Sequence, residues 1–126
     1  MSALEKAATR GVEINLILES PESSDGKIAF DTISALRATL KSKARIFIWP
    51  YSKRESTSEG KYGSLHAKIA ISDNQLYISS ANLTDYAMNL NMEMGTLITG
   101  GELPKQAQCH IDDLIAGGVL VQVPTQ

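Results

Sequence analysis

The chain has 126 residues, of which 43% are hydrophobic and 21% charged, a balance typical of an ordinary globular domain with a single core. No apolar run approaches the roughly 20 residues that cross a bilayer, and no signal peptide is recognisable, so we expect a cytoplasmic protein without a transmembrane segment. The single cysteine, Cys109, excludes an internal disulfide, and we expect it to be a small buried residue on a helix.

The charges are unevenly distributed around a formal net charge of −2. Residues 41–68 carry seven basic and two acidic side chains, a local charge of +5, which leaves −7 for the remainder. Such an asymmetry would draw a polyanion such as nucleic acid toward this block, although a solvated loop that happens to be basic is the alternative. The basic residues are Lys41, Lys43, Arg45, Lys53, Arg54, Lys61 and Lys68.

A short helix and a strand are predicted at the start of the chain. Ser2 and Glu5 have the spacing of a capping box, and the helix that follows Ser2 should stop at Gly11. The apolar run at residues 12–18 then predicts a buried strand.

A second helix and strand follow a polar loop at residues 19–27. Asp31 is a candidate N-cap for a helix through Leu40, and a strand at residues 44–49 ends at Pro50. A helix between two strands indicates a right-handed βαβ unit.

Residues 51–63 are polar and lack apolar periodicity, so they predict a mobile loop. Their position before His66 makes this loop a candidate substrate flap. The aromatic residues Trp49, Tyr51 and Tyr62 either stack on a base or lipid group or serve as packing residues.

Apolar and other residues alternate strictly at residues 65–71, which predicts a strand with one buried face. His66 and Lys68 then project side by side from the opposite face. The alternative is that both are merely solvent-facing residues of an edge strand. The predicted buried set is Leu65, Ala67, Ile69 and Ile71.

A turn at Asp73 and Asn74 and a returning strand at residues 76–79 would bring Ser80 and Asn82 back near the histidine. Imidazole can act as nucleophile or acid, while an ammonium and small hydrogen-bond donors can hold phosphate oxygens. The cluster therefore suits attack on phosphorus and needs no metal or other cofactor.

The remaining elements are a short irregular or helical segment at residues 83–90, a strand at 92–98, a helix opened by Pro104 and ended by Gly117, and a strand at 119–123. The inward stripe of the last helix is Ile111, Leu114 and Ile115.

The central stretch resembles the signature of the phospholipase D superfamily, His-x-Lys-x4-Asp followed by Gly-Ser-x-Asn. Ser79 stands where glycine is usual, and the gap after the aspartate is one residue shorter. The matching residues are His66, Lys68, Asp73, Ser80 and Asn82.

The resemblance implies a single α/β domain over residues 1–126, a mixed and largely parallel sheet flanked by helices in a three-layer sandwich. The family has a strand just upstream of the first helix and, in longer members, a whole first half, so we expect this chain to be a fragment, an internal start or one part of a split protein. The activity implied is metal-independent phosphodiester cleavage through a phosphohistidine. Two copies of the motif share the work, so a homodimer partner or an absent segment must supply the second.

The resemblance also implies a role for each residue. His66 is the nucleophile or the acid, and Lys68, Ser80 and Asn82 bind the phosphate. Asp73 either supports the strand and turn or lies opposite a lysine. Glu93, with Asn91 in support, accepts a hydrogen bond from the imidazole; the alternative is an exposed strand glutamate. The catalytic set is thus His66, Lys68, Asp73 and Glu93.

A closer resemblance is to the phospholipase D-like component of DISARM-type phage-defence systems. It implies a nuclease-type activity on nucleic acid, with defence-system proteins as partners. A lipid phosphodiesterase and a non-catalytic polyanion-binding or assembly subunit are the alternatives. The similar segments are LESP (18–21), FIWP (47–50), SLHAK (64–68), SSANLT (79–84) and NMEMG (91–95).

Overall fold

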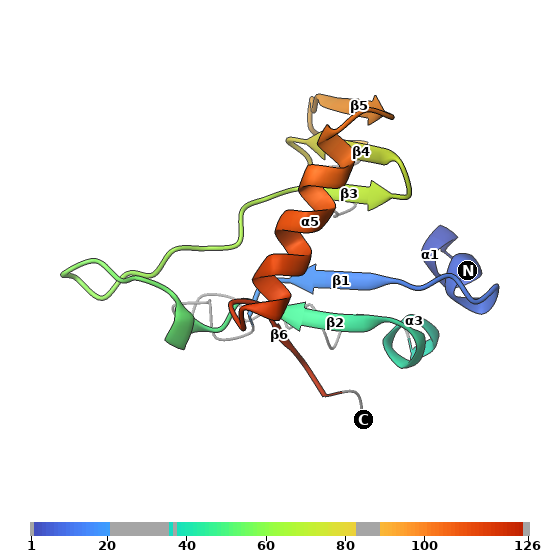
Figure 1. Cartoon of the computed structure of the whole chain (residues 1–126). Coiled ribbons are helices and arrows are strands. Elements are labelled where there is room, and N and C mark those ends of the chain that lie inside the picture. Colours follow the sequence, from blue (N-terminus) through green and yellow to red (C-terminus); the bar gives the residue numbers. More distant parts are fainter. Residues whose placement is uncertain (1, 21–35, 37, 83–88, 125–126) are drawn as a thin grey trace. The chain divides into compact units, whose positions relative to one another are not determined.

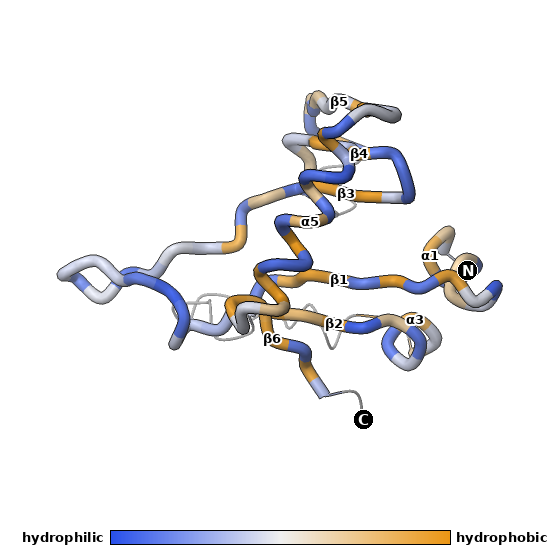
Figure 2. The backbone as a smooth tube through the Cα atoms, in the orientation of Figure 1, coloured by the Kyte–Doolittle hydropathy of each residue, from blue (hydrophilic) through white to orange (hydrophobic). Residues whose placement is uncertain are grey.

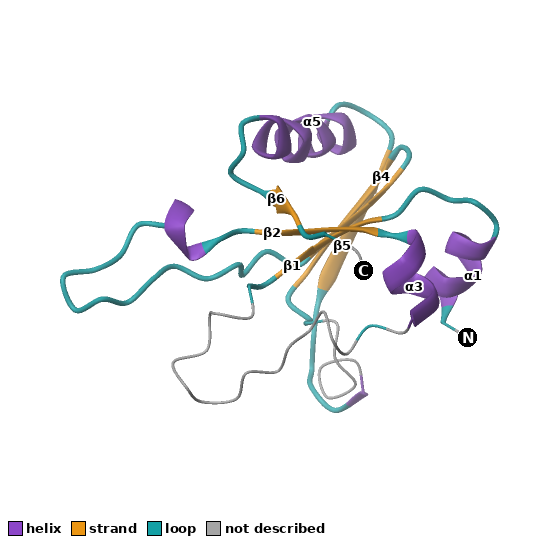
Figure 3. Cartoon of the chain, turned by 90° about the horizontal axis from the view of Figure 1, so that it is seen from below, coloured by secondary structure: helices purple, strands orange, loops and turns teal. Residues whose placement is uncertain are grey.

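The computed structural model describes residues 2–20, 36, 38–82 and 89–124. These form two compact units, one made of residues 1–65 with 117–126 and one made of residues 66–116 (Figures 1 and 3). The predicted N-cap Asp31, most of the predicted polar loop and residues 83–88 lie outside the described residues.

The sheet of the first unit has three strands in the order β1-β2-β6. The strands β1 (Asn15–Leu18) and β2 (Arg45–Ile48) are parallel, whereas β6 (Val121–Gln122) runs antiparallel to β2. The helix α3 (Ala38–Lys43) lies between β1 and β2 in the chain. Hydrophobic residues are frequent along both parallel strands, while the loop after β2 is mostly hydrophilic (Figure 2). The predicted strand-helix-strand order and parallel pairing are therefore confirmed.

The first helix, α1 (Ala3–Thr9), has the predicted capping box. The Ser2 hydroxyl accepts a hydrogen bond from the backbone N–H of Glu5 at 3.2 Å, and the Ser2 N–H donates to the Glu5 carboxylate at 2.6 Å. Gly11 follows with a φ of +87°, which glycine adopts without steric cost. The apolar side chains that join this end of the unit are Ala8, Ile14, Leu40 and Ala44.

The second unit has an antiparallel sheet in the order β3-β4-β5, packed against α5. The elements are β3 (Ile69–Ser72), β4 (Gln75–Ser79), β5 (Gly95–Thr99) and α5 (Leu103–Ala116). The mixed α/β class is thus confirmed. Among the described strands, parallel pairing is confined to β1 and β2, and the other three pairs are antiparallel.

The predicted buried face of residues 65–71 is wrong. The paired strand begins at Ile69, and both Ala67 and Ile69 are exposed, with Ile69 at 42% of its full accessibility. In the described sheet β3 has one neighbouring strand, and alternation predicts which residues share a face without predicting what covers that face.

The prediction for Cys109 is also wrong, because this residue is exposed on α5. It lies two positions before Ile111, which belongs to the half-buried stripe of the helix together with Leu114. Residues two apart on an α-helix lie about 200° apart around the axis, so Cys109 faces away from the stripe.

Candidate active site

His66 and Lys68 lie side by side in an extended segment that leads into β3. The Lys68 Nζ lies 3.3 Å from His66 Nδ1 and donates to the His66 carbonyl oxygen at 2.7 Å. The imidazole is exposed and the lysine is half-buried. Because an ammonium can only donate, this arrangement turns the Nδ1 lone pair toward Lys68 and leaves Nε2 as the outward nitrogen. The predicted pairing of the two side chains is therefore present.

The hairpin formed by β3 and β4 brings the second half of the motif back to the first. Its two-residue turn is Asp73 and Asn74, since Ser72 pairs with Gln75. Directly before β3 begins, the carbonyl oxygen of Lys68 accepts a hydrogen bond from the Ser79 N–H at 3.0 Å. The predicted hairpin thus places the Ser80 end of β4 beside the Lys68 end of β3.

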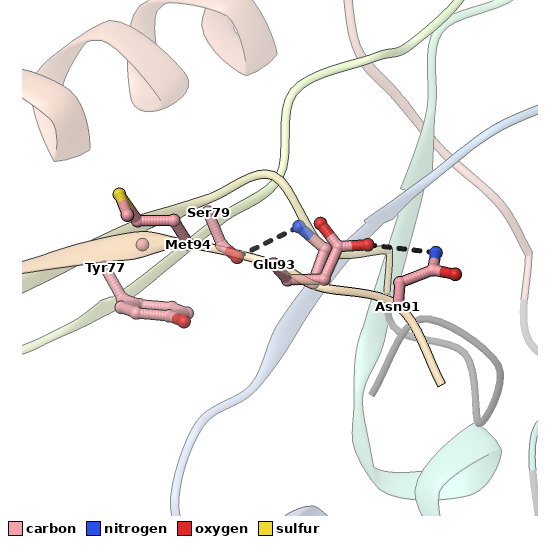
Figure 4. Close-up of a pocket in the computed structure, with 7 residues that line it drawn as sticks. Tyr77, Ser79, Asn91, Glu93 and Met94 are labelled. Carbon is pink, nitrogen blue, oxygen red and sulfur yellow. Dashed lines mark hydrogen bonds between the residues drawn. The ribbon is translucent and has the colours of Figure 1, made fainter. Parts of the chain in front are cut away.

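Ser80 and Glu93 are joined by a short hydrogen bond. The Ser80 hydroxyl donates to Glu93 Oε2 at 2.5 Å. Asn91 Nδ2 donates to Glu93 Oε1 at 3.1 Å (Figure 4). The Met94 N–H donates to the Ser80 hydroxyl oxygen at 3.1 Å, which fixes the direction of the serine hydroxyl. The carboxylate is therefore held by one side chain on each of its oxygens.

These contacts lower the pKa of Glu93 below its ordinary value. The hydrogen bond from Ser80 has the largest effect, followed by the bond from Asn91, and the positive charge of Lys68 adds to both. Glu93 is thus a carboxylate at neutral pH that feels the Lys68 charge.

Lys68 apart, the predicted site residues are not joined to His66 by a hydrogen bond in the described structure. Glu93 is engaged by Ser80 and Asn91, so its role as acceptor for the imidazole stays a prediction. Asn82 is exposed, two residues beyond Ser80. Asp73 lies in the turn at the other end of β3, where its φ is +49°. It follows His66 by seven residues, which span about 23 Å in an extended chain at about 3.3 Å per residue.

A shallow pocket of about 250 Å³ adjoins Glu93 (Figure 4). Tyr77 and Gly95 are among the lining residues that were not predicted as site residues from the sequence. A Cβ placed on Gly95 would meet the Tyr77 hydroxyl oxygen at 2.7 Å, so the ring rests directly on the glycine. The lining residues are Tyr77, Ser79, Ala81, Asn91, Glu93, Met94 and Gly95.

Ser79 fits a position where the motif usually has glycine. Among the described residues other than glycine, only Asp73 has a positive φ, so Ser79 needs no left-handed backbone. It pairs with Gly95 in the sheet, and its hydroxyl accepts a hydrogen bond from the Ala81 N–H at 3.0 Å. Of the paired residues Ser79 and Gly95, it is Gly95 that must be glycine, because a Cβ there would meet the Tyr77 ring.

The basic block is less available to a polyanion than its count implies. Arg54 has a fully buried side chain that is paired with Glu19. Arg45 is paired with Glu13, and Lys61 lies 3.5 Å from Glu59. In the described part of the chain, no three His, Cys, Asp or Glu side chains gather as a metal-binding group. No helix among the described residues is both long and apolar enough to cross a bilayer.

Comparison with known proteins agrees with this architecture. Residues 1–115 match the family described as "Cardiolipin synthase, PLD-like domain". The fold is similar to that of NucT from Helicobacter pylori, with a TM-score of 0.67 and 16% sequence identity over 94% of this chain and 70% of that chain. A search of the curated proteins gave no match. Because the family match spans nearly the whole chain, this protein belongs to the PLD-like domain family.

Proposed function

We propose that this chain is a metal-independent phosphodiesterase that cleaves nucleic acid through a phosphohistidine at His66. The observation that carries the proposal is the His66 and Lys68 pair, to which the hairpin returns Ser80. An imidazole beside an ammonium combines a nucleophile with a cation for phosphate oxygens. Membership in the PLD-like domain family supports the same chemistry.

In the proposed cycle, Lys68, Ser80 and Asn82 hold the phosphate. His66 Nε2 attacks phosphorus, an N–P bond forms, and the bond to the leaving oxygen breaks as a second imidazole protonates that oxygen. The second imidazole then removes a proton from water, the resulting hydroxide attacks phosphorus, and the N–P bond breaks. Both histidines return to their starting protonation states.

Attack through Nε2 requires the imidazole proton to be on Nδ1, the nitrogen that faces Lys68 in the structure. We propose that, when substrate binds, Lys68 turns from Nδ1 to a phosphate oxygen and the ring proton passes through solvent from Nε2 to Nδ1. The Nδ1–H then donates a hydrogen bond to Glu93. A carboxylate in this position fixes the tautomer and stabilises the imidazolium. The Lys68 charge already acts on Glu93, which supports the short reach between these groups.

We infer that the second imidazole comes from His66 of a second copy of the chain. The 126 residues contain one copy of the motif, and a twofold axis would supply the missing acid with the same residue. The alternative source is a motif on sequence outside this chain. The molecular mass in solution, measured together with mixing of His66→Ala and unmutated chains, separates these two arrangements.

Nucleic acid is the proposed substrate class because, in an otherwise acidic chain, the basic block at residues 41–68 leads into the motif and keeps Lys43 and Lys53 exposed beside its paired residues. The description of the family names cardiolipin synthase, so a lipid phosphodiester is the competing substrate. The five segments that resemble the DISARM component lead us to propose a role in phage defence. Loss of protection against phage in cells carrying His66→Ala would support that role, and full protection would contradict it.

The deciding experiment is a cleavage assay in EDTA with single-stranded DNA, duplex DNA, RNA and cardiolipin-containing vesicles. We expect cleavage of a nucleic acid that resists EDTA and is abolished by His66→Ala, with acid-labile phosphate trapped on His66 of the unmutated protein. Full turnover by His66→Ala, or a strict requirement for a divalent metal, would reject the mechanism. If only the cardiolipin-containing vesicles are turned over, the substrate is a lipid phosphodiester and not nucleic acid. Binding of nucleic acid without cleavage by a dimer would favour the non-catalytic alternative.

A further inference from the structure

Arg54 is buried at the start of the loop that precedes the motif. Its side chain is 0% exposed, and its guanidinium lies 4.6 Å from the ring centroids of both Trp49 and Tyr51. Arg54 Nε donates to the Trp49 carbonyl oxygen at 3.0 Å, and Nη1 donates to the Gly63 carbonyl oxygen at 2.8 Å. One guanidinium therefore holds together the two ends of the loop.

Glu19, at the end of β1, completes this arrangement. Its Oε1 accepts from Arg54 Nη2 at 2.5 Å and from the Ser20 N–H at 2.8 Å, while its Oε2 accepts from the Leu65 N–H at 2.7 Å. The two oxygens thus have separate partners, the guanidinium and the backbone of residue 65. We call Glu19 and Arg54, with these bonds, the Glu19–Arg54 clamp.

The clamp is charged at neutral pH. Burial raises the pKa of Glu19, but the hydrogen bonds from Arg54, from the Leu65 N–H and from the Ser20 N–H outweigh it, and the pKa lies below its ordinary value. The ion pair is only partly buried, since the Arg54 side chain is fully buried while that of Glu19 is 26% exposed. It is weak evidence for a stability role, because taking the guanidinium out of water offsets much of the attraction between the two charges. The clamp therefore calls for a reason other than stability alone.

Leu65 is the residue directly before His66, and it ends the first of the two chain segments that make up its compact unit. Fixing the Leu65 N–H restricts the peptide group between Ser64 and Leu65, which lies one residue before His66. Among the loop aromatics, Tyr51 contacts the clamp and also stacks on Tyr62 with ring centroids 4.7 Å apart, while Tyr62 itself is exposed. The Trp49 ring likewise packs against the guanidinium.

We infer that Glu19 and Arg54 are positioning residues that fix the backbone at Leu65 and so hold the His66 imidazole in the orientation needed for attack on phosphorus. This inference rests on the function proposed above. Neither side chain takes part in proton or phosphoryl transfer. Their effect should fall on the rate of the chemical step, because misplacement of a reacting group by about 1 Å can cost on the order of 10²-fold in rate.

The test compares Glu19→Gln and Arg54→Lys with two exposed counterparts, Glu102→Gln and Arg10→Lys. A carboxamide has one oxygen and cannot accept from both Arg54 and Leu65, while a lysine cannot reach both loop carbonyls in the fork geometry of arginine. On bis-p-nitrophenyl phosphate we expect kcat to fall on the order of 10²-fold in both clamp variants with KM within about twofold. The exposed counterparts should keep the unmutated kcat.

Backbone amide NMR supplies a readout that needs no turnover. In the unmutated protein the Leu65 amide proton should be shifted downfield and should move upfield as Glu19 is protonated at acid pH. In Glu19→Gln the downfield shift should be lost, and the His66 ring signals should change. A folded Glu19→Gln protein with unchanged kcat would overturn the inference while leaving the proposed function intact. If the Leu65 amide proton shift of the unmutated protein does not change as Glu19 is protonated, the clamp inference is overturned, even where the clamp variants fail to fold.

The two proposals fail separately. If His66→Ala retains full turnover, the proposed function fails, and the clamp is then judged by the Leu65 amide alone. If His66→Ala is inactive but both folded clamp variants turn over normally, the clamp inference fails alone.

Discussion

The backbone carbonyl of Lys68 accepts a hydrogen bond from the N–H of Ser79 at 3.0 Å, and this bond joins the two halves of the site. The first half, His66 with Lys68, precedes β3, and the second half, beginning with Ser80, follows β4. The bond extends the β3-β4 pairing past the last paired strand residues, Ile69 and Ile78. Any change that shifts the register of this hairpin by one residue would turn Lys68 and Ser79 to different faces.

Lys68→Ala should lower kcat by about 10²- to 10³-fold, because it removes a cation from the developing charge on the phosphate oxygens. The effect on KM should be smaller. Steady-state kinetics on bis-p-nitrophenyl phosphate measures both. Lys105→Ala, which removes an exposed lysine on α5, is the matched control and should change neither constant. Equal kcat values for Lys68→Ala and Lys105→Ala would exclude Lys68 from the chemistry.

Gly95→Ala should destabilise the protein by about 1–3 kcal/mol through overpacking. The added Cβ would meet the Tyr77 hydroxyl oxygen at 2.7 Å and the backbone oxygen of Ile78 at 2.9 Å, and the backbone atom cannot move aside. Gly63→Ala is the control, because its Cβ would lie 3.7 Å from the Trp49 ring, an ordinary contact. Urea unfolding followed by circular dichroism compares them. An equal loss in both variants would show that the close approach at Gly95 is not the cause.

Asp73→Gly should retain kcat within a few fold, since the aspartate lies in the turn remote from His66 and glycine readily adopts its φ of +49°. Asp73→Val should lower the free energy of unfolding by about 1–3 kcal/mol, because a β-branched residue is strained at positive φ. Thermal unfolding and the cleavage assay are run on both. A folded Asp73→Gly protein with a 10²-fold lower kcat would instead place Asp73 in the chemistry.

The stability contributed by Glu19 should depend on pH. Its pKa is lower in the folded state than in the unfolded chain, so the unfolded state binds more protons in acid. The contribution is fully present above the unfolded pKa of about 4.3 and decreases as the pH falls through the lower folded pKa. Urea midpoints of the unmutated and Glu19→Gln proteins should therefore differ most near pH 7 and converge in acid.

Glu102→Gln provides the reference for that titration, because Glu102 is exposed and lies 4.0 Å from Lys105. Its urea midpoint should track the unmutated protein across the whole pH range. A constant difference between Glu19→Gln and the unmutated protein from pH 7 into strong acid would contradict the assigned role of the Glu19 charge.

Features governed by neighbouring residues could be predicted from the sequence. The capping box of Ser2 and Glu5 and the turn at Asp73 depend on residues a few positions apart, and the structure confirms both. The shared face of His66 and Lys68 follows from the two-residue period of extended chain, and their contact confirms it. The family signature could be recognised for the same reason, since its first half occupies one short stretch.

The tertiary structure decided everything that depends on which distant segments meet. The sequence alone does not indicate that Glu19 pairs with Arg54, 35 residues away, or that the Ser80 hydroxyl binds Glu93. The alternation at residues 65–71 and the usual burial of a free cysteine predicted buried positions, at Ala67, Ile69 and Cys109, that the structure shows as exposed. Periodicity defines a face of a strand or helix, but only packing between elements far apart in the chain determines whether that face is covered and which polar groups lie within bonding distance.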